Sequence, residues 1–263
     1  MSSDIFVDSI NHETMRSAVL EYRQTEDLEP HERAALASIS EHIRDKRILD
    51  IGIGAGRTVT GLRQISDDYI GIDYVREMVD HCRGRFPGVR FDHVDARSME
   101  RFDDGSFDLI VFACNGICMV DHAGRLQILR EVHRLLAPGG FFFFSTSNVD
   151  DPRRDRFLEL PRFDVTSNPV KAAVRGARFV GETVYRFCNR VRFRRHQVRT
   201  EEYEILNGKS HHYRTMIYFI GLEQQRRQLE EAGFQPNAAA FDLSGRAIDS
   251  GCRDGTLSFV ARK

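Results

Sequence analysis

The residues best suited to chemistry lie in a short glycine-rich segment near position 50. Asp50 directly precedes three alternating glycines, Gly52, Gly54 and Gly56. Glycines at this spacing permit a tight turn and let a ligand approach the backbone closely. The apolar residues before the turn predict a buried strand, and the residues after it predict a helix. The segment therefore indicates a ligand-binding turn between a strand and a helix.

This turn differs from a dinucleotide-binding site in spacing and charge. The dinucleotide fingerprint G-x-G-x-x-G needs a glycine three residues after its second glycine, and Arg57 stands there. The Asp50 carboxylate would repel a pyrophosphate, whereas it suits a cationic amino-acid group. A nicotinamide oxidoreductase is therefore disfavoured.

The elements around the turn alternate between strands and helices. Helical spacing of apolar residues marks 75–86 and 122–136. The runs predicted as strands lie at 47–51, 69–72, 89–93, 107–112 and 141–144. Such alternation implies right-handed crossovers and a mostly parallel, doubly wound sheet. Two last runs, near 235–243 and 256–261, have no helix between them, so we expect an antiparallel final pair.

The residues from about 150 to 220 form an insertion between the fifth strand and the last helix. Apolar residues recur every three or four positions from Val170 to Val191, which predicts one face of a long helix. The Asn207-Gly208 turn, with strand-like runs at 203–206 and 211–219, predicts a hairpin.

The insertion is also basic, with 13 Lys and Arg against 4 Asp and Glu in 152–199. This charge suits a solvated helix face paired with acidic segments elsewhere. It would also suit the rim of a pocket for an acidic acceptor, or a contact with RNA.

The composition is that of an ordinary globular protein. Of the 263 residues, 41% are hydrophobic and 29% charged, and the formal net charge is -1. The five cysteines are scattered, which is typical of reduced thiols in a cytoplasmic protein. No apolar run is long enough for a membrane span, and the N-terminus lacks the features of a signal peptide. We therefore expect a cytoplasmic protein without membrane contact or bound metal.

As an ordered set, the motifs resemble those of the class I S-adenosylmethionine-dependent methyltransferases. The matching segments are Leu49–Gly56, Gly71-Ile-Asp73, His93-Val-Asp95-Ala96, Phe107–Ile110, Leu135–Gly140 and Leu229–Phe234. The resemblance implies a Rossmann-like α/β fold with a doubly wound seven-stranded sheet, an antiparallel final strand, and a helix-and-hairpin insertion that forms a cap. The implied parts are an N-terminal helical cap segment (1–46), a cofactor-binding core (47–149), the insertion as an acceptor lid (150–220), and a C-terminal helix with closing strands (221–263).

The resemblance also implies S-adenosylmethionine (SAM) as the cofactor, with S-adenosylhomocysteine as its product. Asp50 and the glycine turn would hold the methionine end, and Asp73 would accept both ribose hydroxyls. Asp95 would take the adenine amine. The full set of cofactor-binding candidates is Asp50, Gly52, Gly54, Gly56, Arg57, Asp73, Tyr74, Met78, Asp95, Ala96, Ala113, Cys114 and Asn115.

The acceptor is less clearly marked. His122 and His211 are candidate bases, and Tyr22, His212 and Tyr213 are candidate acceptor contacts. The fourth strand ends in Ala-Cys-Asn-Gly-Ile, which is not the box associated with methylation of base amines in nucleic acid. This end resembles that of bacterial small-molecule methyltransferases, so we expect transfer to an N or O atom of a small molecule, by a monomer or homodimer. An RNA- or protein-modifying enzyme that docks through the basic insertion, or an inactive SAM-binding module, remain alternatives.

Overall fold

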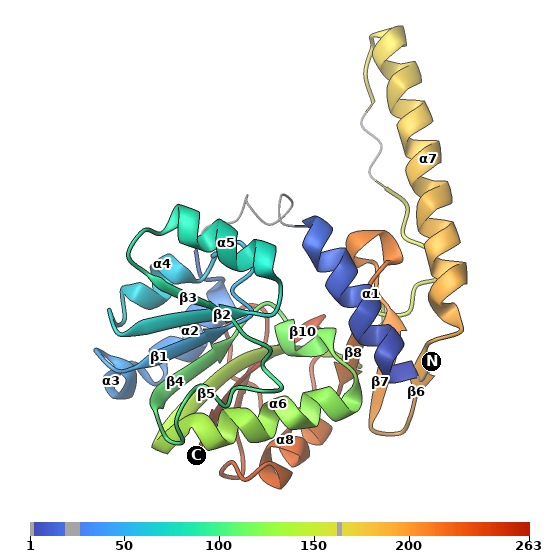
Figure 1. The fold of residues 1–263 in the computed structure, drawn as a ribbon. Coiled ribbons are helices and arrows are strands. Elements are labelled where there is room, and N and C mark those ends of the chain that lie inside the picture. Colours follow the sequence, from blue (N-terminus) through green and yellow to red (C-terminus); the bar gives the residue numbers. More distant parts are fainter. Residues whose placement is uncertain (1–2, 19–26, 162–164) are drawn as a thin grey trace.

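The computed structural model describes residues 3–18, 27–161 and 165–263 (Figure 1). The elements of the first half are α1 (Ser3–Ala18), α2 (Pro30–Ala37), α3 (Ser40–Ile43), β1 (Ile48–Ile51), α4 (Val59–Arg63), β2 (Tyr69–Asp73), α5 (Arg76–Arg85), β3 (Arg90–His93), β4 (Phe107–Phe112), η2 (Gly116–Met119), α6 (His122–Leu135) and β5 (Leu136–Asn148). Those of the second half are α7 (Pro169–Arg194), β6 (Val198–Arg199), β7 (Tyr203–Asn207), η3 (Ser210–Tyr213), β8 (Met216–Ile220), α8 (Leu222–Glu231), β9 (Ala239–Phe241) and β10 (Thr256–Arg262).

The central sheet is mostly parallel. Its first five strands lie in the order β3-β2-β1-β4-β5, all parallel to their neighbours. β10 then pairs antiparallel with β5, and β9 pairs antiparallel with β10. The doubly wound architecture and the antiparallel final pair predicted from the sequence are confirmed.

The sheet has ten strands among the described residues, and not the seven expected. The difference comes from the insertion, whose strands β8, β7 and β6 extend the sheet. β8 joins the far end of the long strand β5, where Ser147 and Asn148 pair with Phe219 and Ile220. The insertion is thus joined to the core by backbone hydrogen bonds.

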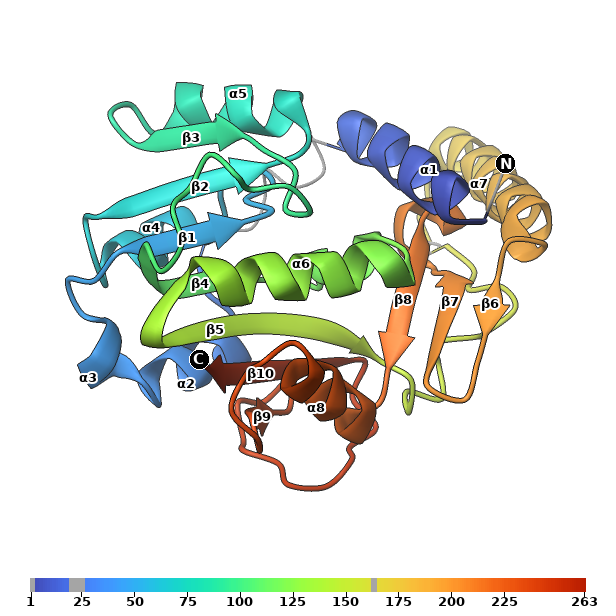
Figure 2. The same cartoon turned by 60° about the horizontal axis from the view of Figure 1, so that its bottom comes forward.

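Helices cover both faces of the sheet because the strand residues are apolar on both sides. Phe142 and Phe144 of β5 belong to the core layer beneath α6 and α8. Phe141 and Phe143 point the other way, into the layer that contains residues of α2 to α5. Figure 2 shows α6 and α8 together on one side of the sheet. Loops at the carboxyl ends of the parallel strands are left free to form a site.

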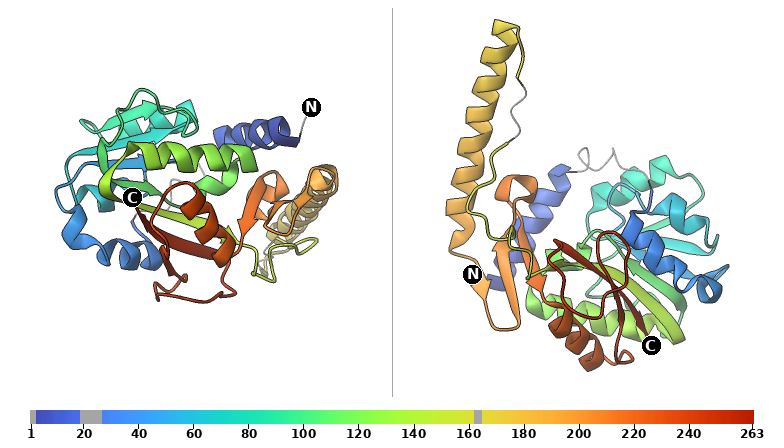
Figure 3. Two further views of the ribbon diagram at one scale, coloured as in Figure 1. Left: turned by 90° about the horizontal axis from the view of Figure 1, so that it is seen from below. Right: turned by 180° about the vertical axis from the view of Figure 1, so that it is seen from behind.

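The insertion projects from this core as an arm. The predicted long helix is α7, and Asn168 caps it by accepting hydrogen bonds from the N–H groups of Val170 and Lys171 at 3.0 Å. Figures 1 and 3 show most of α7 extending beyond the sheet. The hairpin is also present, as β7 and β8.

The strand expected over 211–219 begins later than predicted. His211, His212 and Tyr213 have φ values of 49°, 56° and 63° and form part of the turn η3. Positive φ is incompatible with an extended strand, so β8 starts only at Met216. No helix among the described residues is both long and apolar enough to cross a membrane.

Candidate functional site

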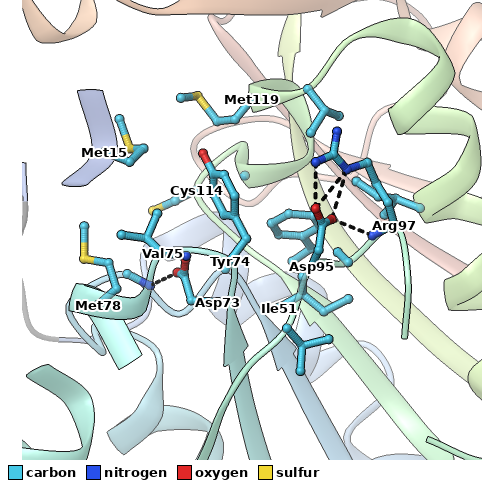
Figure 4. Close-up of a pocket in the computed structure, with 18 of the residues that line it drawn as sticks. Met15, Ile51, Asp73, Tyr74, Val75, Met78, Asp95, Arg97, Cys114 and Met119 are labelled. Carbon is cyan, nitrogen blue, oxygen red and sulfur yellow. Dashed lines mark hydrogen bonds and ion pairs between the residues drawn. The ribbon is translucent and has the colours of Figure 1, made fainter. Parts of the chain in front are cut away.

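A cavity opens where the predicted site was placed, at the carboxyl ends of β1, β2 and β4. Figure 4 shows it between the strand ends and the helix α1. Its lining combines glycine backbone, three carboxylates, one arginine and many apolar side chains. The residues concerned are Asp8, Met15, Ile51, Gly52, Gly54, Asp73, Tyr74, Val75, Met78, Val94, Asp95, Ala96, Arg97, Phe112, Ala113, Cys114, Gly116, Met119, Val120 and Ile128.

The glycine turn forms one wall of this cavity. Gly52 and Gly54 adopt positive φ values of 67° and 53°, which glycine accommodates without strain. A Cβ on Gly52 would lie 2.6 Å from the Phe112 ring. A Cβ on Gly54 would meet no atom within 4 Å, because this residue faces open space. The turn therefore leaves room for a ligand beside Gly54.

Asp73, the last residue of β2, is held rigidly at the edge of the cavity. Its Oδ2 accepts the Gly54 N–H at 3.0 Å, and its Oδ1 accepts the Val75 N–H at 2.8 Å. Each carboxylate oxygen keeps a further lone pair for a ligand hydroxyl. Burial raises the pKa of Asp73 to about 6, against the lowering effect of the two backbone hydrogen bonds.

Tyr74 and several thioether side chains form the apolar part of the wall. The buried Tyr74 hydroxyl has no hydrogen-bond partner among the described residues. In Figure 4 it points toward Met15 and Met119, while Met78 lies beside Asp73. A buried hydroxyl without a partner is costly, so it suits a ligand that supplies one.

Asp95 lies across the cavity and is engaged by Arg97. The Arg97 guanidinium donates to both carboxylate oxygens of Asp95, with a shortest distance of 2.6 Å from Nη2 to Oδ2, and also pairs with Asp8 of α1. Burial alone would raise the pKa of Asp95, but hydrogen bonds from Arg97 lower it below its usual range. An adenine amine would have to share or displace these contacts.

The wall formed by α1 was missed in the sequence analysis. Asp8 and Met15 reach the cavity from this helix, Arg97 reaches it from the loop after β3, and Met119 from η2. The resemblance implied a helical cap segment over 1–46, but nothing in the sequence located its first helix over the glycine turn. Tyr22, proposed as an acceptor contact in this region, lies outside the described residues.

Asp50 does not line the cavity, contrary to the role predicted for it. It is 1% exposed and lies beneath the turn, where it accepts hydrogen bonds from Thr58 Oγ1 at 2.6 Å and Tyr69 OH at 2.8 Å. Burial raises its pKa to about 6. The carboxylate thus ties β1 to β2 and to the start of α4.

Gly56 and Arg57 are also absent from the cavity lining. The space beside Gly56 is filled by Phe86 and Cys82, so this glycine permits close packing against α5. Arg57 forms a double hydrogen bond with the fully buried Glu32 of α2, at 2.5 and 2.7 Å. Both residues therefore help to position the glycine turn from outside the cavity.

Of the three residues after β4 that were predicted to bind the cofactor, two line the cavity and one points elsewhere. Ala113 and Cys114 line the cavity, as expected of residues that follow β4. The Asn115 side chain instead donates to Thr256 Oγ1 at 3.0 Å, and its N–H donates to Ser145 Oγ at 2.7 Å. Asn115 therefore connects the β4 loop to β5 and β10.

The four acceptor-side candidates of the described chain lie elsewhere. His122 stacks on Tyr203 and contacts Tyr218 OH through Nδ1 at 2.8 Å, and burial lowers its pKa. His211 and His212 belong to η3, with His212 Nδ1 at 3.4 Å from Glu182 of α7. Tyr213 is 2% exposed, and its hydroxyl accepts the Glu159 N–H at 2.7 Å. None of the four lines the cavity.

Comparison with known proteins identifies the fold that carries this cavity. Residues 48–140 match the family described as Methyltransferase domain. The chain carries a class I S-adenosylmethionine-dependent methyltransferase domain. The matched residues run from the start of β1 through the first five residues of β5, and they include the glycine turn, Asp73 and Asp95.

The relatives of this methyltransferase domain are similar mainly over the same region. A probable S-adenosylmethionine-dependent methyltransferase of Mycolicibacterium smegmatis is 31% identical over 111 residues, 41% of each chain. A ubiquinone biosynthesis O-methyltransferase of Methylococcus capsulatus is 28% identical over 108 residues, 39% of this chain and 44% of that protein. The chain thus spans about two-fifths of the length of these curated relatives.

The fold similarity extends further than the sequence similarity. The crystal structure of Burkholderia thailandensis 1,6-didemethyltoxoflavin-N1-methyltransferase, with bound 1,6-didemethyltoxoflavin and S-adenosylhomocysteine, has a TM-score of 0.60. It is 13% identical and covers 100% of this chain and 91% of its own. At this identity the comparison concerns the fold of the methyltransferase domain.

The cavity fits SAM, the cofactor of this domain family. Three carboxylates against one guanidinium suit a ligand that carries a sulfonium and an ammonium group. The space beside Gly54 and the unpartnered Tyr74 hydroxyl are features that a bound ligand would fill and satisfy. The apolar side chains around Met78 suit the adenine ring.

Proposed function

We propose that this protein transfers the methyl group of SAM to a nitrogen or oxygen atom of a small-molecule acceptor. The observation that carries the proposal is the Asp73 carboxylate, fixed by the Gly54 and Val75 N–H groups at the edge of a cavity of this charge and shape. When bound, SAM supplies a methyl group already activated by its sulfonium. The protein's contribution is then to bind and align two ligands.

In this proposal, different parts of SAM contact different sides of the cavity. Asp73 would accept the ribose hydroxyls, and the backbone at Gly52 and Gly54 would lie against the methionine moiety. Met78 and Val75 would pack near the adenine, with Asp95 and Ala96 at its polar edge. Cys114 and Met119 would then lie on the side where the acceptor enters. These assignments are supported by the presence of all these residues in the cavity lining.

The titratable groups of the cavity favour a nitrogen acceptor. No histidine is among the described residues that line it. Burial raises the pKa of Tyr74 well above its usual value, and Arg97 pairs with both Asp8 and Asp95. A hydroxyl acceptor needs a base to remove its proton, whereas a neutral amine attacks with its own lone pair. The lining therefore supports alignment without a strong base.

The position of α1 supports a small acceptor. Asp8 and Met15 bring this helix against the cavity, which leaves less room for a macromolecular substrate than an open groove would. One similar structure holds the small molecule 1,6-didemethyltoxoflavin, and one relative is named for ubiquinone biosynthesis. Several arginines of the insertion are paired within the chain, for example Arg186 with Glu182 and Arg190 with Asp155, which weakens the case for RNA docking.

The proposal is tested by following the transfer of a radiolabelled methyl group from SAM. Purified protein is incubated with pools of small amines, small hydroxyl compounds, RNA and protein, and the labelled products are separated by size. We expect label only in small molecules, and first in the amine pools. Label in RNA or protein would contradict the acceptor class. SAM binding without transfer to any pool would favour an inactive binding module.

A further inference from the structure

The insertion arm (residues 150–220) exposes apolar side chains to solvent, most of them on α7. Among the described residues, eleven large hydrophobic side chains are exposed, and ten of them lie between Phe157 and Val191. Val170 is 72% exposed and Val184 is 54% exposed, and both belong to the apolar face that the sequence predicted for this helix. The residues of this stripe, named here the valine stripe, are Val170, Val174, Ala177, Val180, Val184, Phe187 and Val191.

The valine stripe has the period of a helix that packs against another helix. Val170, Ala177, Val184 and Val191 are each seven residues apart, and Val180 and Phe187 fall three residues after the second and third of them. This is the a/d pattern of helices that interlock side by side, with β-branched residues at most a positions. Ala173, Gly176 and Gly181 are small enough to let a second helix approach closely.

The chain itself covers the other side of α7. Arg186 donates to the Glu159 carbonyl at 3.0 Å, and Arg190 pairs with Asp155 at 2.6 Å. At 3.6 residues per turn, these two arginines lie on the side of the helix away from the valine stripe. Figures 1 and 3 show the segment before α7 running along the helix on the side that faces the rest of the molecule. Among the described residues, Phe157 packs on Phe187 at the edge of the stripe, with ring centroids 6.0 Å apart, and the stripe otherwise stays exposed.

The charges of α7 favour an apolar partner for the stripe. The helix has seven basic residues and one acidic residue. At helical spacing, Lys171, Arg175 and Arg178 also point away from the stripe. RNA would draw cations to the contact face, whereas two packed helices place them outside the seam. The stripe thus fits another apolar helix face better than RNA, and its seven-residue period favours a helix over a lipid surface.

We propose that the valine stripe packs against the valine stripe of a second copy of this chain. A twofold dimer brings the same patch of both subunits together. Outside the arm, Leu243 is the single large hydrophobic side chain that the described residues expose, so the partner surface within a second copy is its own arm. The six large side chains of the stripe are 45–72% exposed, so a pair of stripes would approach the lower end of the range for stable interfaces, about 1,200 Å².

Sedimentation equilibrium of the full chain over a wide concentration range tests this dimer. The variant Val180→Glu/Val184→Glu places charges in the stripe, and Lys171→Gln/Arg178→Gln changes the net charge equally on the other side of the helix. We expect the wild type and the second variant to dimerise. The first variant should dimerise roughly a hundredfold or more weakly, because it would bury unpaired charges. Circular dichroism of each variant checks that the fold is kept.

Two results would overturn the proposal. One is a wild-type chain that stays monomeric at all concentrations, and the other is a Val180→Glu/Val184→Glu variant that dimerises like the wild type. Co-sedimentation with vesicles that contain phosphatidylglycerol separates the competing occupant. A monomer that binds these vesicles through the stripe would assign the surface to lipid and contradict the dimer.

Discussion

Asn11 of α1 and Met216 of β8 are 205 residues apart and share two hydrogen bonds. The Asn11 Nδ2 donates to the Met216 carbonyl at 2.8 Å, and its Oδ1 accepts the Met216 N–H at 2.8 Å. The same Nδ2 donates to the Met119 carbonyl at 2.7 Å. The fully buried Asn11 side chain therefore links α1 both to the insertion strand β8 and to η2, whose Met119 lines the cavity.

Replacing Asn11 with alanine should loosen α1 and weaken SAM binding. The change leaves buried backbone groups of Met119 and Met216 without partners, at a cost of about 1–3 kcal/mol. Since α1 carries Asp8 and Met15 to the cavity, we expect the affinity for SAM to fall by about tenfold or more. Isothermal titration calorimetry measures this loss.

The control is Asn168→Ala, which removes an asparagine whose side chain caps the start of α7. It should destabilise the start of α7 and leave SAM affinity unchanged, because α7 contributes no residue to the cavity. Equal SAM affinity in Asn11→Ala and wild type would show that α1 is not part of the binding site.

A methyl group at Gly54 should interfere with the ligand more than with the fold. Gly54 and Gly105 both have positive φ, at 53° and 64°, and an added Cβ meets no atom closer than 3.8 Å at either position. Alanine should therefore cost each about 1–2 kcal/mol of folding free energy. Only Gly54 lines the cavity. We expect Gly54→Ala to lose SAM affinity and Gly105→Ala to keep it, with similar melting temperatures. Similar SAM affinities in the two variants would place the ligand away from the turn.

The affinity for SAM should depend on pH through Asp73. Burial raises the pKa of this carboxyl to about 6 from 3.8, so without ligand it is protonated below that pH. Ribose hydroxyls that donate to the charged form would expel the proton. SAM affinity should then be constant above pH 6 and fall by about tenfold per pH unit below it, with proton release on binding. Calorimetry in buffers of different ionisation enthalpy measures that release.

Asp50 provides the control for this titration. Its pKa is also raised to about 6 by burial, but it lies beneath the turn and outside the cavity. Asp50→Asn should keep the pH dependence of SAM binding. The folding stability of the free protein depends on pH in the opposite direction to the SAM affinity. A carboxyl with a raised pKa in the folded state adds stability that is complete below pH 3.8 and is lost as the pH rises through 6. A flat affinity profile from pH 5 to 8 would contradict the role of Asp73.

The sequence predicts the core well because local pattern and fold agree there. The apolar run of β4 is buried on both faces, and the glycine turn has the positive φ values that its composition suggested. The predicted number of strands was wrong because β8 pairs with β5, which is distant in the sequence. No pattern in 216–220 indicates which strand this segment pairs with. The sequence likewise left open what contacts the apolar face of α7, since amphipathic spacing defines an apolar face but not what covers it.

The candidate site was predicted in part. Residues at strand ends, such as Asp73 and Ala113, reach the cavity because the parallel sheet brings its carboxyl ends together. Asp50 and Arg57 do not reach the cavity, because each is held by a buried partner outside it. Asp50 is held by Tyr69, and Arg57 is held by Glu32. The positions of these partners depend on packing between distant elements. The contribution of Asp8 likewise depends on where α1 docks.

The most direct test of the central claim is calorimetric titration of the purified chain with SAM, for the wild type, Asp73→Ala and Asp92→Ala. Asp92 lies on the neighbouring strand β3 and outside the cavity. We expect micromolar binding by the wild type and by Asp92→Ala, and at least about tenfold weaker binding by Asp73→Ala, since two ligand hydroxyls lose a charged acceptor. Absence of SAM binding to the wild type, or equal binding by all three proteins, would contradict the account.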